Sequence, residues 1–165
     1  MKKNKLNYEI VDNFLEKEEF LKIKNLITGC NFPWYYNSTV AENSSKDGFY
    51  FTHTFFHDLN VTSDKFNLLY PIFKKLNLKS LIRAKSNFYP KTQEIKEHDT
   101  HTDYGYKHNG FIFYINTNNG FTRLQNGEKI DSIENRGLFF DPSFNHNSST
   151  CTDQDGRINI NFNYF

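Results

Sequence analysis

The chain of 165 residues has little cysteine, and Cys30 and Cys151 are too few for a disulfide framework. Its first ten residues contain no apolar stretch of the length that a secretory signal peptide needs. No window of the sequence approaches the ~20 apolar residues of a membrane-spanning helix. These absences predict a protein of the reducing cytoplasm that has no membrane partner.

An excess of charge of one sign is also missing, because 20 Lys and Arg residues stand against 19 Asp and Glu residues. Nucleic-acid binding depends on clustered basic side chains that neutralise phosphates, so this balance argues against a nucleic-acid partner. Aromatic residues, in contrast, are abundant, with 18 Phe and 10 Tyr. A chain of this size buries about 70% of its unfolded surface, so we expect a single domain over residues 1–165. The oligomeric state stays open.

The first half of the sequence predicts two helices. Apolar residues at helical spacing predict an amphipathic helix over residues 11–29, which begins with a capping box of Asn13 and Glu16. A second helix is expected from Ser63 onward, and Pro71 should bend or divide it.

Residues 31–58, between the two predicted helices, place many aromatic side chains among Ser, Asn and Gly, which predicts loops and short strands. Two interpretations stay open: these aromatics form a recognition surface or lid, or they fill gaps where the helices meet a sheet. We expect substrate specificity to lie in residues 31–62 and 91–97, with Trp34 and Tyr35 in contact with the substrate.

The second half predicts strands. A continuous apolar run covers residues 111–116, and residues 157–164 alternate between polar and apolar, as in a half-buried strand with a polar face. Asn-Gly turn signals at residues 118–120, 126–127 and 135–137 predict hairpins between short strands. Several short strands at this spacing predict a β-sandwich or barrel.

One group of residues could carry chemistry. His101 and Asp103 form a His-x-Asp motif, and on a strand residues two apart share a face, so both can chelate one metal ion. His146 follows later in the chain, and Arg157 opens the alternating strand. Two His and one carboxylate make the facial triad of non-haem Fe(II) oxygenases, which leaves three metal positions open. The planar guanidinium of Arg157 suits a carboxylate of a bidentate 2-oxo acid.

In this order the motifs resemble the Fe(II)/2-oxoglutarate-dependent oxygenases, in particular the prolyl-hydroxylase-like branch with its small phage and bacterial members. The resemblance covers about residues 83–165. In chain order the matching motifs are Phe88-Tyr89-Pro90, His101-Thr102-Asp103, Tyr114-Ile115-Asn116, Gly120-Phe121-Thr122, His146 and Arg157. The sequence departs from the family at Asn119, where the family has the first Gly of Gly-Gly-x-Thr.

The resemblance implies a mainly β fold, a double-stranded β-helix or jelly roll. In this arrangement residues 83–165 form the core that holds the metal site, and residues 1–82 supply helical support and substrate loops.

The resemblance also assigns the site residues. It implies that His101, Asp103 and His146 hold Fe(II) and form the catalytic centre. Arg157 is expected to bind the C5 carboxylate of 2-oxoglutarate, and Tyr89 and Tyr114 to hydrogen-bond to the same co-substrate.

The implied reaction is that of a dioxygenase. It uses O₂ to convert 2-oxoglutarate into succinate and CO₂ while it hydroxylates a C–H bond of a peptide, prolyl residues included, or of a small molecule. Ascorbate is the expected reductant.

Three other interpretations fit parts of the sequence. A non-catalytic jelly-roll module could use residues 34–36 as a contact surface. Nucleic-acid dealkylation by the same chemistry is a second alternative. Enzymes of that branch typically have a second Arg six positions after the one that corresponds to Arg157, and this chain has Asn163 there. A zinc site built on His98 and His101 lacks the further Cys or His pair that zinc spacing requires.

Overall fold

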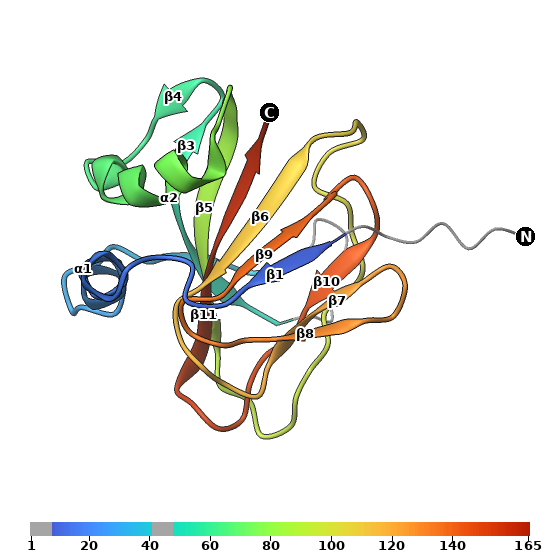
Figure 1. Cartoon of the computed structure of the whole chain (residues 1–165). Helices are drawn as coiled ribbons and strands as arrows, with labels where there is room; N and C mark the ends of the chain where they lie inside the picture. Colours follow the sequence, from blue (N-terminus) through green and yellow to red (C-terminus); the bar gives the residue numbers. More distant parts are fainter. Residues whose placement is uncertain (1–7, 41–47) are drawn as a thin grey trace, which may run out of the picture.

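The computed structural model describes residues 8–40 and 48–165 (Figure 1). Its helical segments are α1 (Lys17–Ile27), the short 3₁₀ helix η1 (Phe66–Leu69) and α2 (Tyr70–Leu76). Its strands are β1 (Glu9–Val11), β2 (Tyr35–Asn37), β3 (Tyr50–His57), β4 (Asn60–Val61), β5 (Leu81–Pro90), β6 (Asn109–Tyr114), β7 (Phe121–Leu124), β8 (Lys129–Asp131), β9 (Gly137–Phe140), β10 (His146–Ser148) and β11 (Gly156–Tyr164).

The described strands form two antiparallel sheets. The larger has the order β1-β9-β6-β11-β5-β3-β2, with β4 paired to β3, and the smaller has the order β10-β7-β8. In Figure 1 the helices lie on one side of the large sheet and the small sheet on the other. This is the layered arrangement of a jelly roll, and it confirms the predicted fold class of a mainly β protein with N-terminal helices.

The hydrophobic core lies mainly between the helices and the outer face of the large sheet. Ile23 of α1 and Ile72 of α2 belong to the same buried cluster as Phe113 of β6 and Ile160 of β11. Because side chains alternate along a strand, the neighbouring residues on β6 and β11 point to the opposite face, toward the small sheet. That inner face holds the cavity described below.

Residues 8–40 and 48–82 contribute more than helices and loops, since they also contribute β1 to β4 to the large sheet. β1 pairs with β9, so that Ile10 lies opposite Leu138. A pairing between residues this far apart in sequence leaves no local pattern, which is why the strand was not predicted.

The first helix starts later than expected. α1 begins at Lys17 with Glu16 as its N-cap, and no side chain caps it, so the predicted capping box is wrong. Asn13 has a φ of 53°, in the left-handed region, where no α-helical residue lies. The side chain of Asn135 instead accepts a hydrogen bond from the Leu15 backbone N–H and donates one to its carbonyl.

The second helix is divided as predicted. η1 ends at Leu69 and α2 follows directly, with Pro71 in its first turn, where a missing backbone N–H costs no intrahelical hydrogen bond.

One of the three predicted hairpins is present. β7 and β8 pair around residues 126–127, where Gly127 has a φ of 87°. Residues 118–120 and 135–137 instead connect strands of different sheets, β6 to β7 and β8 to β9. A jelly-roll chain crosses between its two layers, and a local turn signal cannot distinguish such a crossing from a hairpin.

β11 lies in the middle of the large sheet, between β5 and β6. Its predicted alternation is correct, but the polar side chains of Arg157, Asn159 and Asn163 are at most 2% exposed. The strand is therefore buried on both faces rather than half-buried, and its polar face points into the molecule. No helix in the described part of the chain has the length and apolarity to cross a membrane.

Candidate metal centre

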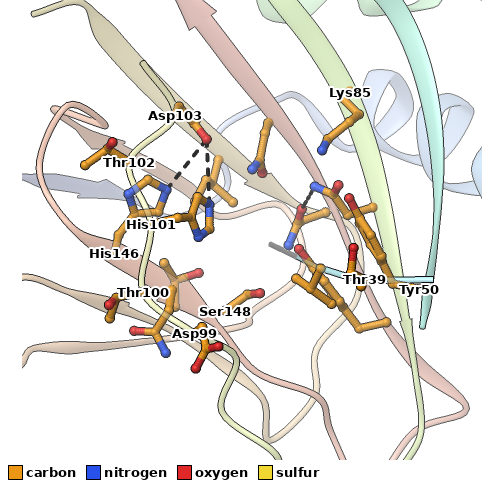
Figure 2. A pocket seen from close by; sticks show the side chains of 18 of the residues that line it. Thr39, Tyr50, Lys85, Asp99, Thr100, His101, Thr102, Asp103, His146 and Ser148 are labelled. Carbon is orange, nitrogen blue, oxygen red and sulfur yellow. Dashed lines mark hydrogen bonds and ion pairs between the residues drawn. The ribbon is translucent and has the colours of Figure 1, made fainter. Parts of the chain in front are cut away.

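The three predicted metal ligands lie together. The candidate ligand atoms of His101, Asp103 and His146 are all within 4.8 Å of one another. Asp103 Oδ1 is 3.7 Å from His101 Nε2 and 4.0 Å from His146 Nε2, and Figure 2 shows the two imidazoles facing that carboxylate. In residues 8–40 and 48–165, these three form the group of His, Cys, Asp or Glu side chains that lie close enough together to hold one metal ion.

Backbone hydrogen bonds position the ligands. His101 and Asp103 lie in the connection between β5 and β6 rather than on the expected regular strand, and His101 forms an isolated bridge with His146. The His101 N–H donates to the His146 carbonyl at 3.0 Å, and the His146 N–H donates back at 2.9 Å. The Asp103 N–H donates to the carbonyl of Pro142 at 3.0 Å. These bonds join two segments that are far apart in sequence.

His146 has the hydrogen-bonding pattern of a metal ligand. Its Nδ1 lies 3.0 Å from the Phe144 carbonyl, to which it can donate a proton, and this leaves a lone pair on Nε2. Nε2 is buried and has no hydrogen-bond partner among the described residues. Leaving a buried polar atom unpaired costs about 1–3 kcal/mol, which a metal ion bound at this position would offset. The donor set of two imidazoles and one carboxylate fits Fe(II).

Neighbouring side chains hold the Asp103 carboxylate. Its Oδ2 accepts a hydrogen bond from Asn163 Nδ2 at 2.8 Å, and its Oδ1 lies 3.1 Å from Arg83 Nη2. Burial raises the pKa of Asp103, but Arg83 and His146 outweigh burial and bring it to about 2, so the carboxylate is ionised at neutral pH. Burial and the nearby His146 lower the pKa of His101, which favours the neutral form that a metal needs.

Arg157 lies next to the same cavity as a buried cation without a counter-ion. Its side chain is fully buried, Nε donates to Ser132 Oγ at 2.7 Å and Nη2 to Thr122 Oγ1 at 2.8 Å. Nη1 has no hydrogen-bond partner, and no described carboxylate forms an ion pair with the guanidinium. The rings of Tyr89 and Tyr114 lie 5.5 and 5.6 Å from its central carbon. This arrangement suits a bound carboxylate.

A cavity of about 930 Å³ connects these features. Tyr89 and Thr122 line it at the Arg157 end, and His101, Asp103 and His146 line it at the candidate metal centre. The Tyr114 hydroxyl donates to Thr122 Oγ1 at 2.8 Å, behind the cavity wall. The residues expected to bind metal and co-substrate thus surround one space.

The two predicted substrate residues lie elsewhere. Trp34 packs against Phe32 and Phe88 at the edge of the hydrophobic core, as the gap-filling interpretation expects. Tyr35 is 61% exposed, and its ring stacks on that of His53. Neither lines the cavity. Their contact with substrate stays a prediction.

Other residues of the same region do line the cavity, among them Asn37, Thr39 and Tyr50. They were not singled out because isolated polar or aromatic side chains in this region carry no spacing signal.

Sequence reasoning also missed residues on the sheet. Arg83 and Lys85 line the cavity from β5, where polar and apolar residues alternate as they do on β11, so the same period-2 signal could have indicated them. Thr122 belongs to the matching motif Gly120-Phe121-Thr122, but no role was predicted for it. In the structure its hydroxyl accepts a hydrogen bond from Arg157. His98 hydrogen-bonds through Nδ1 to Ser148 Oγ at 2.7 Å and does not join the candidate metal centre, so a zinc pair with His101 does not form.

No model of a known protein family matches the sequence, and no curated protein matches it. Solved structures do match. A 2OG-Fe(II) oxygenase-family oxidoreductase from Burkholderia pseudomallei has a TM-score of 0.72 and 10% identity, over 95% of this chain and 84% of that one. A prolyl hydroxylase from Trichoplax adhaerens, in complex with a hypoxia inducible factor peptide fragment, has a TM-score of 0.70 and 16% identity, over 98% and 84%.

A third match is the non-heme alpha ketoglutarate dependent epimerase SnoN from nogalamycin biosynthesis, with a TM-score of 0.68 and 11% identity, over 97% of this chain and 78% of that one. The chain therefore has the double-stranded β-helix fold of the 2-oxoglutarate/Fe(II) oxygenases, prolyl hydroxylases among them. At this identity the likeness defines the fold, while the reaction must be argued from the site.

Proposed function

We propose that this protein is an Fe(II)- and 2-oxoglutarate-dependent dioxygenase that hydroxylates a peptide or a small molecule. The observation that carries the proposal is the placement of three metal ligands and an unpaired buried guanidinium around one cavity. Fe(II) with O₂ would supply the oxidation that converts 2-oxoglutarate into succinate and CO₂ and hydroxylates a substrate C–H bond, and ascorbate would serve as the reductant that keeps the iron ferrous.

Each residue has a role in this proposal. His101, Asp103 and His146 hold the metal on one side and leave the cavity side open. Arg157 and Thr122 bind the C5 carboxylate of 2-oxoglutarate, while the Tyr89 and Tyr114 hydroxyls, whose pKa values are raised by burial, stay protonated and able to donate.

The two other interpretations are less well supported. A purely structural module would gain nothing from a buried, unpartnered His146 Nε2 and an uncompensated Arg157, both of which cost stability. For dealkylation, Asn163 occupies the position of the second Arg, and its amide donates to Asp103.

The test is an anaerobic titration of metal-free protein with Fe(II) and 2-oxoglutarate, followed by visible absorption spectroscopy. We expect a weak metal-to-ligand charge-transfer band, and succinate formation after O₂ is added. Correctly folded protein that shows neither the band nor succinate would rule out the proposed function.

Arg157→Met tests the co-substrate site. The variant keeps the buried volume but removes the charge, and hydrogen bonds to charged groups contribute about 1.5–3 kcal/mol, so we expect the 2-oxoglutarate concentration for half-saturation to rise roughly 10- to 100-fold. Titration of the charge-transfer band measures it, with Fe(II) affinity as the internal control. An unchanged requirement for 2-oxoglutarate would place its C5 carboxylate elsewhere.

A further inference from the structure

Lys85 is a cation in the cavity wall that has no anionic partner. It lies on β5, and Figure 2 shows its amino group directed into the cavity across from His101 and His146. The nearby Arg83 is paired with Asp103, whereas Lys85 forms no ion pair with any carboxylate of the described residues. Its ammonium lies over the Tyr50 ring, 5.7 Å from Nζ to the ring centroid.

This position is costly without a ligand. Burial and the neighbouring Arg83 lower the pKa of Lys85 to about 8 and outweigh the opposing effect of the Asp103 carboxylate, because the protonated form is poorly solvated there. At neutral pH the side chain is still mainly a cation. An anion bound beside it would form a charge-assisted hydrogen bond and remove the penalty of an uncompensated charge.

Lys85 is too far along the sheet to share the C5 carboxylate with Arg157. In the β5–β11 register, Tyr89 lies opposite Arg157 and Lys85 lies opposite Asn161. Tyr89 lies four positions after Lys85, which is about 13 Å along a strand. The Asn87–Asn159 hydrogen bond, 3.0 Å long, lies between the two rows. Lys85 therefore belongs to a second part of the cavity.

The wall around this second part is polar. Asn87 Oδ1 and Asn161 Oδ1 are buried and have no hydrogen-bond partner among the described residues, and Asn147 Oδ1 on the β10 side is in the same state. Val40 and Ile112 are the aliphatic residues of the lining. An apolar group such as a prolyl ring would leave these amides unpaired, whereas a ligand with N–H or O–H groups would satisfy them.

We propose that Lys85 anchors the substrate, and that the substrate is a small polar molecule whose carboxylate or phosphate pairs with the Lys85 ammonium. Asn87 and Asn161 receive its hydrogen-bond donors, and the molecule spans the cavity toward His101 and His146. The proposal rests on the proposed function for the reaction, but substrate binding can be measured separately.

The experiment measures binding to full-length protein loaded anaerobically with Fe(II) and saturating 2-oxoglutarate, so that the Arg157 site is already occupied. The probes are free L-amino acids, each matched with its carboxamide, and sugar phosphates, each matched with the parent sugar. The first set tests carboxylate and the second tests phosphate. Calorimetry gives affinities, and thermal unfolding shows that each variant is folded.

Two neutral variants, Lys85→Met and Lys85→Gln, remove the charge, and Lys85→Arg keeps it. Lys74→Met on α2 is the matched control, because Lys74 is exposed and does not line the cavity. We expect at least one anionic probe to bind wild type ten times more tightly than its neutral counterpart. The neutral variants should lose that difference, while Lys85→Arg and Lys74→Met retain it.

Three results overturn the proposal: no anionic probe exceeds its neutral counterpart in wild type, the neutral variants keep the difference, or they weaken 2-oxoglutarate binding instead. Failure of the proposed function looks different. In that case wild type binds neither Fe(II) nor 2-oxoglutarate, and the same probes are compared on the metal-free protein.

Discussion

Unsatisfied polar atoms are concentrated at one place in this protein. Of the eight buried side-chain nitrogen and oxygen atoms without a partner among the described residues, six belong to residues that line the cavity. The other two belong to Arg157 and Asn163, which bind the lining residues Thr122 and Asp103. Native proteins leave few buried polar groups unpaired, so such a cluster indicates a cavity built to be filled by polar partners, water or ligand, rather than poor packing.

Asp103→Ala tests the candidate metal centre at this scale. The change removes the carboxylate that both imidazoles face. Mutation of a residue that only hydrogen-bonds to a metal ligand typically lowers metal affinity roughly 10- to 100-fold. Because Asp103 is itself a candidate ligand, its loss should lower Fe(II) affinity by more than this. Succinate formation should stop while circular dichroism shows a retained fold. Asp131→Ala, at an exposed position of β8, is the control. Retained Fe(II) binding in Asp103→Ala would contradict the ligand assignment.

At the scale of elements, adjacent strands and the turns between them build the site. β5 and β11 pair along their lengths, and side chains on one face of the pair supply the cavity wall from Arg83 to Tyr89 on β5 and at Asn159 and Asn161 on β11. The turn before β7 packs directly against Arg157, since a Cβ added to Gly120 would lie 2.7 Å from its Cδ. The proposed co-substrate site therefore depends on close approach of the backbone.

Gly120→Ala should displace Arg157 and weaken 2-oxoglutarate binding. The added methyl would also meet the Thr150 carbonyl at 2.7 Å, and relief of such overpacking costs about 1–3 kcal/mol of stability. Gly105→Ala is the matched control, because a Cβ there meets nothing within 4 Å. The measurements are 2-oxoglutarate titration and thermal unfolding. If Gly120→Ala has the 2-oxoglutarate affinity and thermal midpoint of the wild type, the turn relaxes around the added methyl group and the prediction is wrong.

His53 joins three segments and predicts a pH dependence of stability. From β3, its ring contacts the Pro33 carbonyl at 2.8 Å and Ser63 Oγ at 2.7 Å. Burial lowers its pKa below the usual 6.5, more than the hydrogen bond to Pro33 raises it. The unfolded chain therefore binds more protons than the folded chain as the pH falls through about 6.5, and the free energy of unfolding decreases.

We expect the thermal midpoint of metal-free protein to fall between about pH 7.5 and pH 5.5, and to fall less in His53→Gln. His57→Gln, at an exposed position of the same strand, should follow the wild type. An equal fall in His53→Gln would assign the effect to other groups.

At the scale of the whole molecule, stability and chemistry lie on opposite faces of the large sheet. The outer face packs under α1 and α2, while the inner face carries the polar cavity. Packing changes under the helices should therefore affect folding more than ligand binding.

Ile23→Ala tests this separation. Ile23 is fully buried, and such a truncation typically costs 2–5 kcal/mol, so we expect a lower urea midpoint with Fe(II) and 2-oxoglutarate affinities near wild type. Leu21→Ala, on the same helix at 38% exposure, should cost much less. A large loss of metal affinity in folded Ile23→Ala would show that the two faces are coupled.

Patterns that depend on nearby residues could be predicted from the sequence. The alternation of β11, the division at Pro71 and the hairpin at Gly127 each follow from backbone geometry over a few residues. The candidate ligand set followed from the residue types and the order of the motifs, and the structure brings His101, Asp103 and His146 together.

Features that depend on distant residues were decided by the tertiary structure. The pairing of β1 with β9, the support of Leu15 by Asn135 and the ion pair of Arg83 with Asp103 join segments without any local signal. The polar face of β11 shows the difference most directly. Its alternation is local, but whether that face meets water or a cavity depends on the second sheet that covers it.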